Sequence, residues 1–478
     1  MNAKPARRRT KIIATLGPAT RAPGALRTLL EAGVDVVRLN LAHDDPRAHQ
    51  RTAAAARDAA KDLDRVVGVL VDLPGPKMRT GPIVDGAVLL EAEGDFTLTE
   101  EELEGDAARV CTSVEGLSGM VSSGDVIYLA DGAIVLEVRD TGSSDVHTSV
   151  VRGGVLRSRK GMHIPRAERV VQTFSATDRD ALKVGLGLRA DLVGLSFVRD
   201  ALDVRRVREA LPKRGHVPHL VAKIETSSAV ENLEEIIAEA DAVMVARGDL
   251  GIQTPLRSVP LLQKEIIDAC NKAGKPVITA TQMLESMTRA PLPTRAEVAD
   301  VANAVLDGTD ALMLSEETAV GEYARETVAT MADIALSAEA RPCGTERPSP
   351  RERSDDRVSW AVARAAVEAA EDVAVRAILC PTRSGATPRR VAAFRPSMPI
   401  IGLSGSRATI GALALVWGVI PLPMPAMKEA RDAREEVERT TRASREAGLV
   451  DAGDLVAVAA GSPGPRAGRT DYVRIARC

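Results

Sequence analysis

Eight short apolar runs, separated by stretches with a helical pattern, limit the folds open to this chain more than any other feature. Strands that alternate with helices form parallel sheets, and eight such units before residue 340 fit a closed (β/α)8 barrel better than an open doubly wound sheet. The predicted strands span residues 11–16, 35–40, 66–73, 191–197, 219–225, 242–247, 276–281 and 311–315.

Two segments differ in character from this repeat. The first is rich in Gly and Asp turns and in short alternating runs, which predicts an inserted all-β domain. The second begins with a polar, proline-bearing stretch typical of a linker and continues with four further apolar runs, which predicts an open α/β domain. We therefore expect a catalytic barrel at 1–80 and 166–340, a β lid at 81–165, and a C-terminal α/β regulatory domain at 341–478.

Composition excludes several classes of protein. The 478 residues include 63 Lys and Arg against 66 Asp and Glu, a formal net charge of −3, and only 2% are aromatic, which argues against nucleic-acid and membrane-surface partners. Five scattered cysteines without a CxxC pair fit free thiols in the cytoplasm. The uncharged stretch 408–427 is interrupted by prolines, so a buried helix followed by a strand is expected there instead of a membrane span.

Polar residues stand at or just after the ends of seven of the eight predicted strands. In a barrel of this kind the loops that follow the strands share one rim, so these side chains should meet at one site. The residues are Arg38 and Asn40, Asp72, Ser196, Lys223 and Glu225, Asp249, Thr281, and Ser315 and Glu317.

Each of these residues alone has an ordinary structural explanation. Asp249 could cap a turn, Glu317 could start a helix, and Arg38 could pair with an acid inside the barrel. If only structural explanations applied, polar residues would have to fall at seven strand ends of one rim by coincidence. Their joint occurrence therefore favours a functional site.

The charges at this rim indicate phosphoryl chemistry with a metal ion. Glu225 and Asp249 are hard oxygen ligands that suit Mg²⁺ and leave positions for substrate and water. Lys223 and Arg38 are cations that suit the oxygens of a phosphoryl group in transfer. Thr281 supplies a hydroxyl that could help to relay a proton, and Gly248 lets the backbone approach a ligand closely.

Ordered motifs from Arg8 to near the C-terminus together resemble the pyruvate kinase family. They are RRTKIIATLGPAT, VVRLNLAH, GPKMRTG, SRKGMHIP, VAKIE, VARGDLG, TATQMLESM and PTRAEVADVANAVLDGTDALMLSEETA. The resemblance implies transfer of the phosphoryl group of phosphoenolpyruvate to ADP, protonation of the enolpyruvate to pyruvate, a requirement for Mg²⁺, and a homotetramer.

The resemblance also assigns residues to ligands. Substrate contacts are implied for Arg38, Lys223, Gly248, Asp249 and Thr281, with Lys223 stabilising the transition state and Glu225 and Asp249 holding Mg²⁺. Nucleotide contacts are implied for the segment 40–43, which includes Asn40 and His43, and for Arg79 and Lys160. Because Lys160 lies near the end of the insert, we expect the insert to close over ADP and exclude water.

One departure from the family pattern concerns a monovalent cation. Many relatives hold K⁺ with the equivalents of Asn40, a Ser, Asp72 and a Thr, whereas this chain has Ala42 and Leu73 at the Ser and Thr positions. It also carries Lys77 where the K⁺-using relatives carry Glu. We hypothesise that the Lys77 ammonium replaces K⁺, with Asn40 and Asp72 as partners, so that K⁺ is not required. The alternative is that Lys77 is a solvated loop charge.

Two further departures make the rim more acidic than in the family. Glu316 and Asp44 each replace a glycine, and carboxylates close to a phosphate site repel the substrate unless they point outward. These residues could mark a weakened or specialised paralogue.

A second site is predicted in the C-terminal domain, where the segment 380–387 ends a strand and opens a helix. Thr382, Ser384, Gly385 and Thr387 offer hydroxyl and backbone N–H groups that suit a phosphate. The alternative is that Thr382 and Ser384 only cap the helix. Relatives bind effectors at this loop, so the resemblance implies activation by a phosphorylated sugar or AMP, to which Arg466 and Arg469 of the last loop could contribute.

Two rival functions remain open from the sequence. A non-catalytic paralogue that still senses phosphosugars would be expected to have lost Lys223 or a metal ligand, and this chain retains them. An enolate-forming lyase or aldolase on the same barrel would also use two carboxylates and a metal, but would not need the insert or the C-terminal domain.

Overall fold

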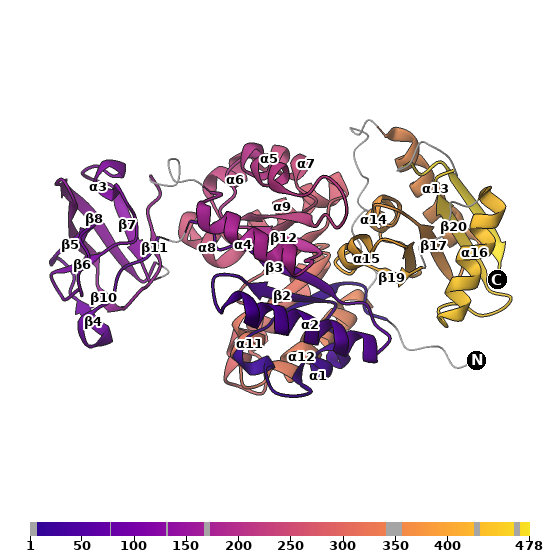
Figure 1. Cartoon of the computed structure of the whole chain (residues 1–478), viewed down its shortest axis with the longest axis horizontal. Helices are drawn as coiled ribbons and strands as arrows, with labels where there is room; N and C mark the ends of the chain where they lie inside the picture. Colours follow the sequence, from indigo (N-terminus) through magenta and orange to yellow (C-terminus); the bar gives the residue numbers. More distant parts are fainter. Residues whose placement is uncertain are drawn as a thin grey trace.

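The computed structural model describes residues 7–76, 78–130, 132–166, 173–340, 356–424, 431–462 and 469–478. Three parts follow one another along the long axis of the molecule, with the insert at one end, the barrel in the middle and the C-terminal α/β part at the other end (Figure 1). The limits of the three predicted domains stay a prediction, whereas their sheets are described below.

The eight predicted strands all exist and close into one parallel barrel. Around the barrel the order is β1-β16-β15-β14-β13-β12-β3-β2, which brings β3 beside β12 across the insert. The (β/α)8 fold class is therefore confirmed. The strands are β1 Lys11–Thr15, β2 Val36–Asn40, β3 Gly68–Asp72, β12 Leu192–Leu195, β13 His219–Ile224, β14 Ala242–Ala246, β15 Val277–Ala280 and β16 Ala311–Leu314.

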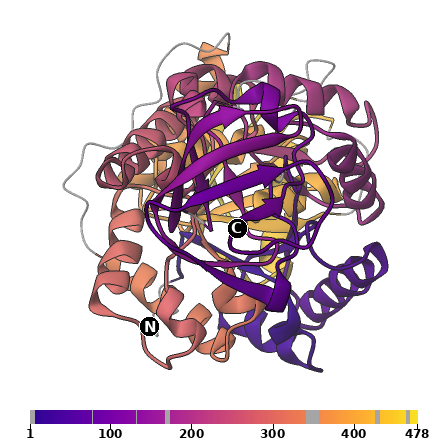
Figure 2. The same ribbon diagram turned by 90° about the vertical axis from the view of Figure 1, so that its left-hand side faces the viewer.

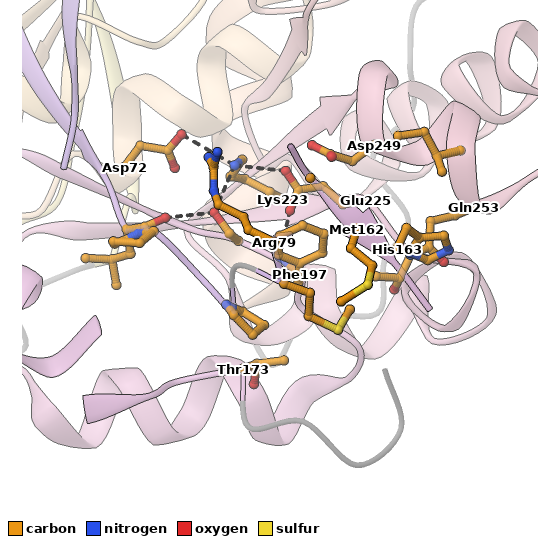
Figure 3. Close-up of a pocket in the computed structure, with 18 of the residues that line it drawn as sticks. Asp72, Arg79, Met162, His163, Thr173, Phe197, Lys223, Glu225, Asp249 and Gln253 are labelled. Carbon is orange, nitrogen blue, oxygen red and sulfur yellow. Dashed lines mark hydrogen bonds and ion pairs between the residues drawn. The ribbon is translucent and has the colours of Figure 1, made fainter. Parts of the chain in front are cut away.

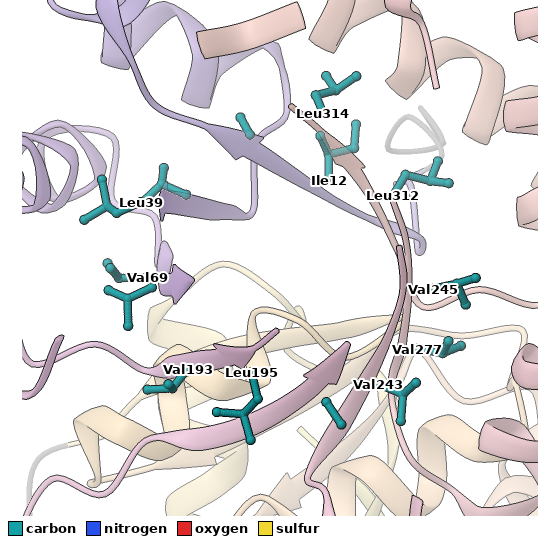
Figure 4. Close-up of a cluster of buried hydrophobic side chains, with 14 of the residues drawn as sticks. Ile12, Leu39, Val69, Val193, Leu195, Val243, Val245, Val277, Leu312 and Leu314 are labelled. Carbon is teal, nitrogen blue, oxygen red and sulfur yellow. The ribbon is translucent and has the colours of Figure 1, made fainter. Parts of the chain in front are cut away.

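Successive side chains of each strand point alternately to the helices and to the barrel interior, because the side-chain period of a strand is two. Ile12, Val69 and Val243 belong to the outer layer that packs under the helices (Figure 4), and Ile13 and Leu70 belong to the interior layer. The helices are α1 Ala25–Ala32, α2 Pro46–Asp62, α4 Ala176–Gly187, α5 Ala201–Ala210, α6 Ser227–Glu231, α7 Leu233–Glu239, α8 Arg247–Gln253, α9 Val259–Ala273, α10 Arg295–Leu306, α11 Glu316–Ala319 and α12 Ala324–Glu339.

The insert is an all-β unit with its own core. It has a six-stranded sheet in the order β11-β7-β8-β9-β5-β6 and a two-stranded ribbon of β10 and β4. Figure 2, which looks along the long axis, shows this unit in front of one end of the barrel. Its elements are β4 Ala87–Leu90, β5 Asp95–Thr99, β6 Arg109–Cys111, α3 Leu117–Met120, β7 Val126–Leu129, β8 Ile134–Thr141, β9 Asp145–Arg152, β10 Gly154–Arg157 and β11 Met162–His163.

The two chain segments that connect insert and barrel are paired with each other. Arg79 forms an antiparallel bridge with Gly161, and the Thr80 N–H donates to the Lys160 carbonyl at 2.9 Å. The segment that leaves the barrel therefore lies beside the one that returns to it.

The C-terminal part has a five-stranded sheet in the order β19-β18-β17-β20-β21. The first four strands were predicted, but β21 was not, because its alternating YVRIAR pattern lies at an exposed sheet edge and lacks an apolar run. Within the described ranges, no helix combines the length and apolar character that a membrane crossing needs. The elements are α13 Arg357–Asp372, β17 Ala377–Pro381, α14 Ala386–Ala393, β18 Ile400–Ser404, α15 Arg407–Leu413, β19 Val419–Pro423, α16 Ala433–Glu446, β20 Leu455–Ala460 and β21 Tyr472–Arg477.

The end of α15 closes the amino end of the barrel. Ala412, Ala414 and Leu415 belong to the same buried cluster as the interior side chains of the strands. A side chain at Gly411 would collide with the carboxyl group of Asp191 at the start of the fourth strand unit, so this close approach requires glycine. We call these three apolar residues the α15 plug.

Candidate active site

A cavity of about 380 Å³ lies between the carboxyl ends of the barrel strands and the insert. The barrel lines it with charged and polar side chains, and the insert and its connections line the opposite side. Of the predicted site residues, the cavity brings together Arg38, Asn40, Asp72, Arg79, Lys160, Ser196, Lys223, Glu225 and Asp249.

Lys223 is the centre of this cavity's charge network (Figure 3). Its ammonium lies 2.8 Å from Glu225 Oε1 and 3.4 Å from Asp72 Oδ2, and donates to Ser196 Oγ at 2.9 Å. Burial by itself lowers the pKa of Lys223, but the carboxylates of Asp72 and Glu225 outweigh burial and hold that pKa above its ordinary value. Lys223 therefore stays a cation at neutral pH.

Arg38 is the second cation and shares a carboxylate with Lys223. Its Nη2 and Nε lie 2.5 and 3.0 Å from Asp72 Oδ2, and its Nη1 donates to Thr15 Oγ1 at 3.0 Å. Burial raises the pKa of Asp72, but Lys223 and Arg38 outweigh burial and hold that pKa below its ordinary value. Asp72 Oδ1 is buried and has no hydrogen-bond partner among the described residues. The suggestion that Arg38 pairs with an acid in the barrel is therefore correct, and this pair lies inside the cavity.

Two carboxylates face the cavity from neighbouring strand ends. Glu225 follows β13 and is 1% exposed, and its Oε2 accepts the Phe197 N–H at 2.6 Å. Asp249 is in the first turn of α8, directly after β14. Within the described part of the chain, no group of three or more His, Cys, Asp or Glu could hold a metal ion. Glu225 and Asp249 are hard oxygen donors that both line the cavity, and two such carboxylates fit a Mg²⁺ ion that takes its other ligands from substrate and water.

Thr281 and Gly248 are beside this cavity but do not line it. Thr281 Oγ1 accepts the Gly248 N–H at 2.9 Å and donates to the Ala280 carbonyl at 2.6 Å. The backbone of Thr281 is in the left-handed region with φ 68°, which is uncommon for a β-branched residue. In this structure the Thr281 hydroxyl therefore fixes the start of α8, which carries Asp249.

The predicted nucleotide residues divide into two groups. Arg79 and Lys160 lie on the paired connections of the insert and line the cavity, as does Asn40 at the end of β2. His43 does not line it, and its carbonyl accepts from His49 Nε2 at 2.7 Å. Lys77, the proposed substitute for K⁺, lies outside the described residues.

The acidic departures from the family pattern do not enter the cavity. Asp44 pairs with Arg21 at 2.6 Å on the surface, and Glu316 begins α11. Glu317 is buried, and its carboxylate accepts the backbone N–H groups of Ser315 at 2.7 Å and Leu284 at 3.3 Å. Glu317 lies in the first turn of α11 and ties the start of that helix to the loop of Leu284, so its structural explanation applies.

Two models of one protein family together match nearly the whole length of the chain. A family model described as "Pyruvate kinase, barrel domain" matches residues 7–328, and one described as "Pyruvate kinase, alpha/beta domain" matches residues 360–476. The chain belongs to the pyruvate kinase family. The resemblance drawn from the motifs is confirmed, and the relatives are enzymes of the transferase class.

Three curated relatives show the extent of this similarity to pyruvate kinases. The pyruvate kinase of Geobacillus stearothermophilus is 41% identical over 474 residues, which cover 98% of this chain and 80% of that protein. The pyruvate kinase of Thermococcus litoralis is 39% identical over 474 residues, 98% of each chain. That of Thermotoga maritima is 38% identical over 468 residues, 98% of this chain and 99% of the relative.

The predicted effector loop of this pyruvate kinase family member lies between β17 and α14. Thr382 Oγ1 accepts the Gly385 N–H at 2.9 Å, which is the capping contact considered as the alternative. Thr387 is buried, and its hydroxyl bonds to Thr470 Oγ1 at 2.8 Å. Ser384 is exposed. Of the last loop, Arg469 is described and exposed, whereas Arg466 lies outside the described residues.

Three features of the site were missed by sequence reasoning. Thr15 ends the first strand and holds Arg38, so the strand-end rule applied to all eight strands would have found it. The Phe197 N–H donates to Glu225 from a residue with φ 55°, a backbone feature that no sequence pattern indicates. The contact between His163 and Gln253 joins the insert to the barrel across 90 residues and has no local signal.

Proposed function

We propose that this chain transfers the phosphoryl group of phosphoenolpyruvate to ADP and so produces pyruvate and ATP. The observation that carries the proposal is one cavity in which Lys223 lies against Glu225, with Asp249 beside them, and which Arg79 and Lys160 line from the insert's connections. Family membership supports the same reaction.

The cations of the barrel bind and orient the phosphoryl group. Lys223 and Arg38 are both fixed by Asp72, so they are already placed before the substrate binds and do not have to reorganise as charge moves during transfer. Lys223 also pairs with Glu225, so the positive charge offered to the phosphate oxygens depends on Mg²⁺ balancing the carboxylates of Glu225 and Asp249. Lys223 is therefore the residue that we assign to the transition state.

Glu225 and Asp249 would hold Mg²⁺, which when bound neutralises charge on the phosphate and carboxylate oxygens of the substrates. The Phe197 N–H fixes one oxygen of Glu225, and the tie between Thr281 and Gly248 fixes the turn that carries Asp249. The Thr281 hydroxyl is already bonded to two backbone groups. We therefore assign the protonation of enolpyruvate to a water molecule near Thr281.

Arg79 and Lys160 are assigned to the phosphates of ADP. Both side chains belong to the paired connections of the insert, so they come into place together with it. Closure of the insert would exclude water from the phosphoryl group in transfer. Asn40 and His43 are proposed nucleotide residues on the barrel side, although only Asn40 lines the cavity in this structure.

A coupled assay of phosphoenolpyruvate, ADP and Mg²⁺ tests the proposed function. We expect pyruvate formation that needs all three components. Release of pyruvate at the same rate without ADP would indicate a lyase-type or hydrolytic reaction on this barrel, and binding of the ligands without turnover would indicate a non-catalytic paralogue. Either result would overturn the proposal.

We further propose that K⁺ is not required, because Lys77 supplies the missing positive charge. Asp72 Oδ1 supports this, since it is a buried acceptor without a partner among the described residues and would suit a cation. Activity should persist when K⁺ is replaced by tetramethylammonium. A collapse of activity in that salt would show that the Lys77 ammonium does not replace K⁺.

We propose that a phosphorylated sugar or AMP activates the enzyme through the loop that contains Ser384. Exposure of Ser384 and Arg469 supports the site, while the buried hydroxyl of Thr387 makes that residue a support for the loop. Activators should shift the saturation curve for phosphoenolpyruvate, and Ser384→Ala should weaken the shift. Unchanged curves across a panel of such ligands would remove the claim.

A homotetramer is proposed for the assembly. Large apolar side chains on the barrel support self-association, because Leu256, Leu261 and Leu292 are 78%, 62% and 74% exposed in the single chain. Light scattering on the purified protein should give a mass of four chains, and a monomer at micromolar concentration would contradict the proposal.

A further inference from the structure

One polar contact joins the insert directly to the barrel beside the proposed metal ligands. His163 is the last residue of β11 in the insert, and Gln253 is the last residue of α8 in the barrel. The Gln253 amide donates from Nε2 to His163 Nδ1 at 2.9 Å. Both side chains line the cavity, and Figure 3 shows them next to each other on the side where Asp249 lies.

Gln253 is connected to both carboxylates that we assign to Mg²⁺. It is four residues after Asp249 on α8, so the two residues are one helical turn apart. Its carbonyl accepts the Ser227 hydroxyl at 3.0 Å, and Ser227 follows Glu225 by two residues. The Gln253 side chain therefore projects from the same helix as Asp249, and the Gln253 carbonyl is bonded to the loop that follows Glu225.

His163 is equally well fixed on the insert side. Its ring stacks on Tyr128 of β7 with 5.7 Å between the centroids and an interplanar angle of 23°. It is three residues after Lys160, and between them Gly161 pairs with Arg79. The position of the imidazole is thus tied to both insert residues that we assign to ADP.

We propose that the His163–Gln253 pair is a latch that holds the insert closed over bound nucleotide, and that both are positioning residues for ADP. The inference rests on the proposed function. Phosphoenolpyruvate is assigned to barrel residues alone, whereas ADP depends on Arg79 and Lys160, whose positions depend on the insert. Loss of the latch therefore weakens ADP binding and leaves phosphoenolpyruvate binding largely unchanged.

Two variants remove the hydrogen bond while keeping the local packing. His163→Phe keeps a ring to stack on Tyr128 but has no Nδ1, and Gln253→Met keeps the length and helical preference of the side chain but has no amide. Each should raise the KM for ADP about three- to tenfold, as expected for one hydrogen bond, with the KM for phosphoenolpyruvate within about twofold of wild type. The double variant should be no worse than the worse single variant, because each substitution removes the same contact.

A matched control lies in the same insert. His147 on β9 contacts Thr97 Oγ1 at 3.2 Å within the insert sheet, so His147→Phe should leave both KM values unchanged. Thermal unfolding of every variant identifies any that misfold, and the remaining single variant then carries the test. Additive effects in the double variant, equal rises in both KM values, or unchanged KM values in an active enzyme would overturn the latch. An inactive wild type would instead overturn the proposed function.

Discussion

Buried lysines and aspartates occur at both ends of the barrel, and the pKa values of Lys11 and Asp191 at the amino end shift in the direction opposite to those of Lys223 and Asp72 at the carboxyl end. At the carboxyl end, Asp72 and Glu225 raise the pKa of Lys223 despite its burial, and the pKa of Asp72 is lowered. At the amino end, burial lowers the pKa of Lys11 to about 8 and raises that of Asp191 to about 7. Burial is similar at both ends, so the partners decide the direction of each pKa shift.

The hydrogen-bond partners of Lys11 and Asp191 are uncharged backbone groups, whereas Asp35 at the same end pairs with Arg8 at 2.8 Å and keeps a pKa below its ordinary value. The Lys11 ammonium donates to the Val419 carbonyl of the C-terminal part at 2.7 Å, and Asp191 Oδ2 accepts the Val69 N–H at 2.9 Å. Such groups stabilise a charge less than an opposite charge does, so burial prevails there. Lys223 and Asp72 at the carboxyl end thus stay charged, whereas Lys11 and Asp191 at the amino end are charged only at a cost.

Removing the central cation of the carboxyl end should have the largest effect. Lys223→Ala should lower kcat by on the order of 10²- to 10³-fold, because a preorganised charge is lost from the transition state. Steady-state kinetics with saturating substrates measure this change. The control Lys183→Ala removes an exposed lysine that pairs with Asp180 on α4 and should keep full activity. A loss below tenfold for Lys223→Ala would contradict its role.

At the amino end, removing a charge should stabilise the fold. The folded-state pKa of Asp191 is raised to about 7, so its carboxyl group stabilises the protein only at low pH and this contribution is lost as pH rises through 7. Asp191→Asn should therefore be more stable than wild type by on the order of 2 kcal/mol at pH 8, with a smaller difference at pH 5.

Denaturant unfolding at pH 5 and pH 8 checks the Asp191 prediction. Asp180→Asn, a change at an exposed carboxylate, serves as the control and should show no such pH dependence. If Asp191→Asn were less stable than wild type at pH 8, the buried carboxylate would have to be well solvated or paired, and the contrast between the two ends would fail.

The smallest expected effect concerns Lys11. Its folded-state pKa is lowered to about 8, so the unfolded chain binds more protons between pH 8 and its ordinary value of 10.5, and stability rises with pH across that window. Lys11→Met lacks this titration but leaves the Val419 carbonyl without its donor. Relative to Lys11→Met, wild type should gain about 1 kcal/mol between pH 7.5 and pH 10. A constant difference over that range, measured by denaturant unfolding, would show that Lys11 is not desolvated.

The barrel could be predicted from the sequence because its strands are buried on both faces and therefore appear as continuous apolar runs. Polar residues at the ends of such runs share one rim, which is why Lys223, Glu225 and Asp249 were expected together and do line one cavity. Their roles in the reaction stay a prediction. The strand ends alone did not show which of these residues point elsewhere, such as Thr281 and Glu317.

The remaining features depend on contacts between distant parts of the chain. Asp72 on β3 contacts both Arg38 on β2 and Lys223 on β13 because the closed barrel places β3 between β2 and β12, although the insert separates β3 from β12 and β13 in sequence. Thr387 was expected at the effector surface, but Thr470 from the last loop covers its hydroxyl. No local sequence pattern indicates these long-range contacts, because the order of the strands in each sheet must be known before the contacts can be predicted.

The α15 plug has a consequence for how the chain is made on the ribosome. The last barrel strand ends at Leu314, but Ala412, Ala414 and Leu415, which cover the amino end of the barrel interior, emerge roughly a hundred residues later. Until then the nascent barrel presents an uncovered apolar opening to water, a surface at which chaperones bind and aggregation begins. Synthesis speed across the segment between barrel and plug should therefore govern the yield of native enzyme.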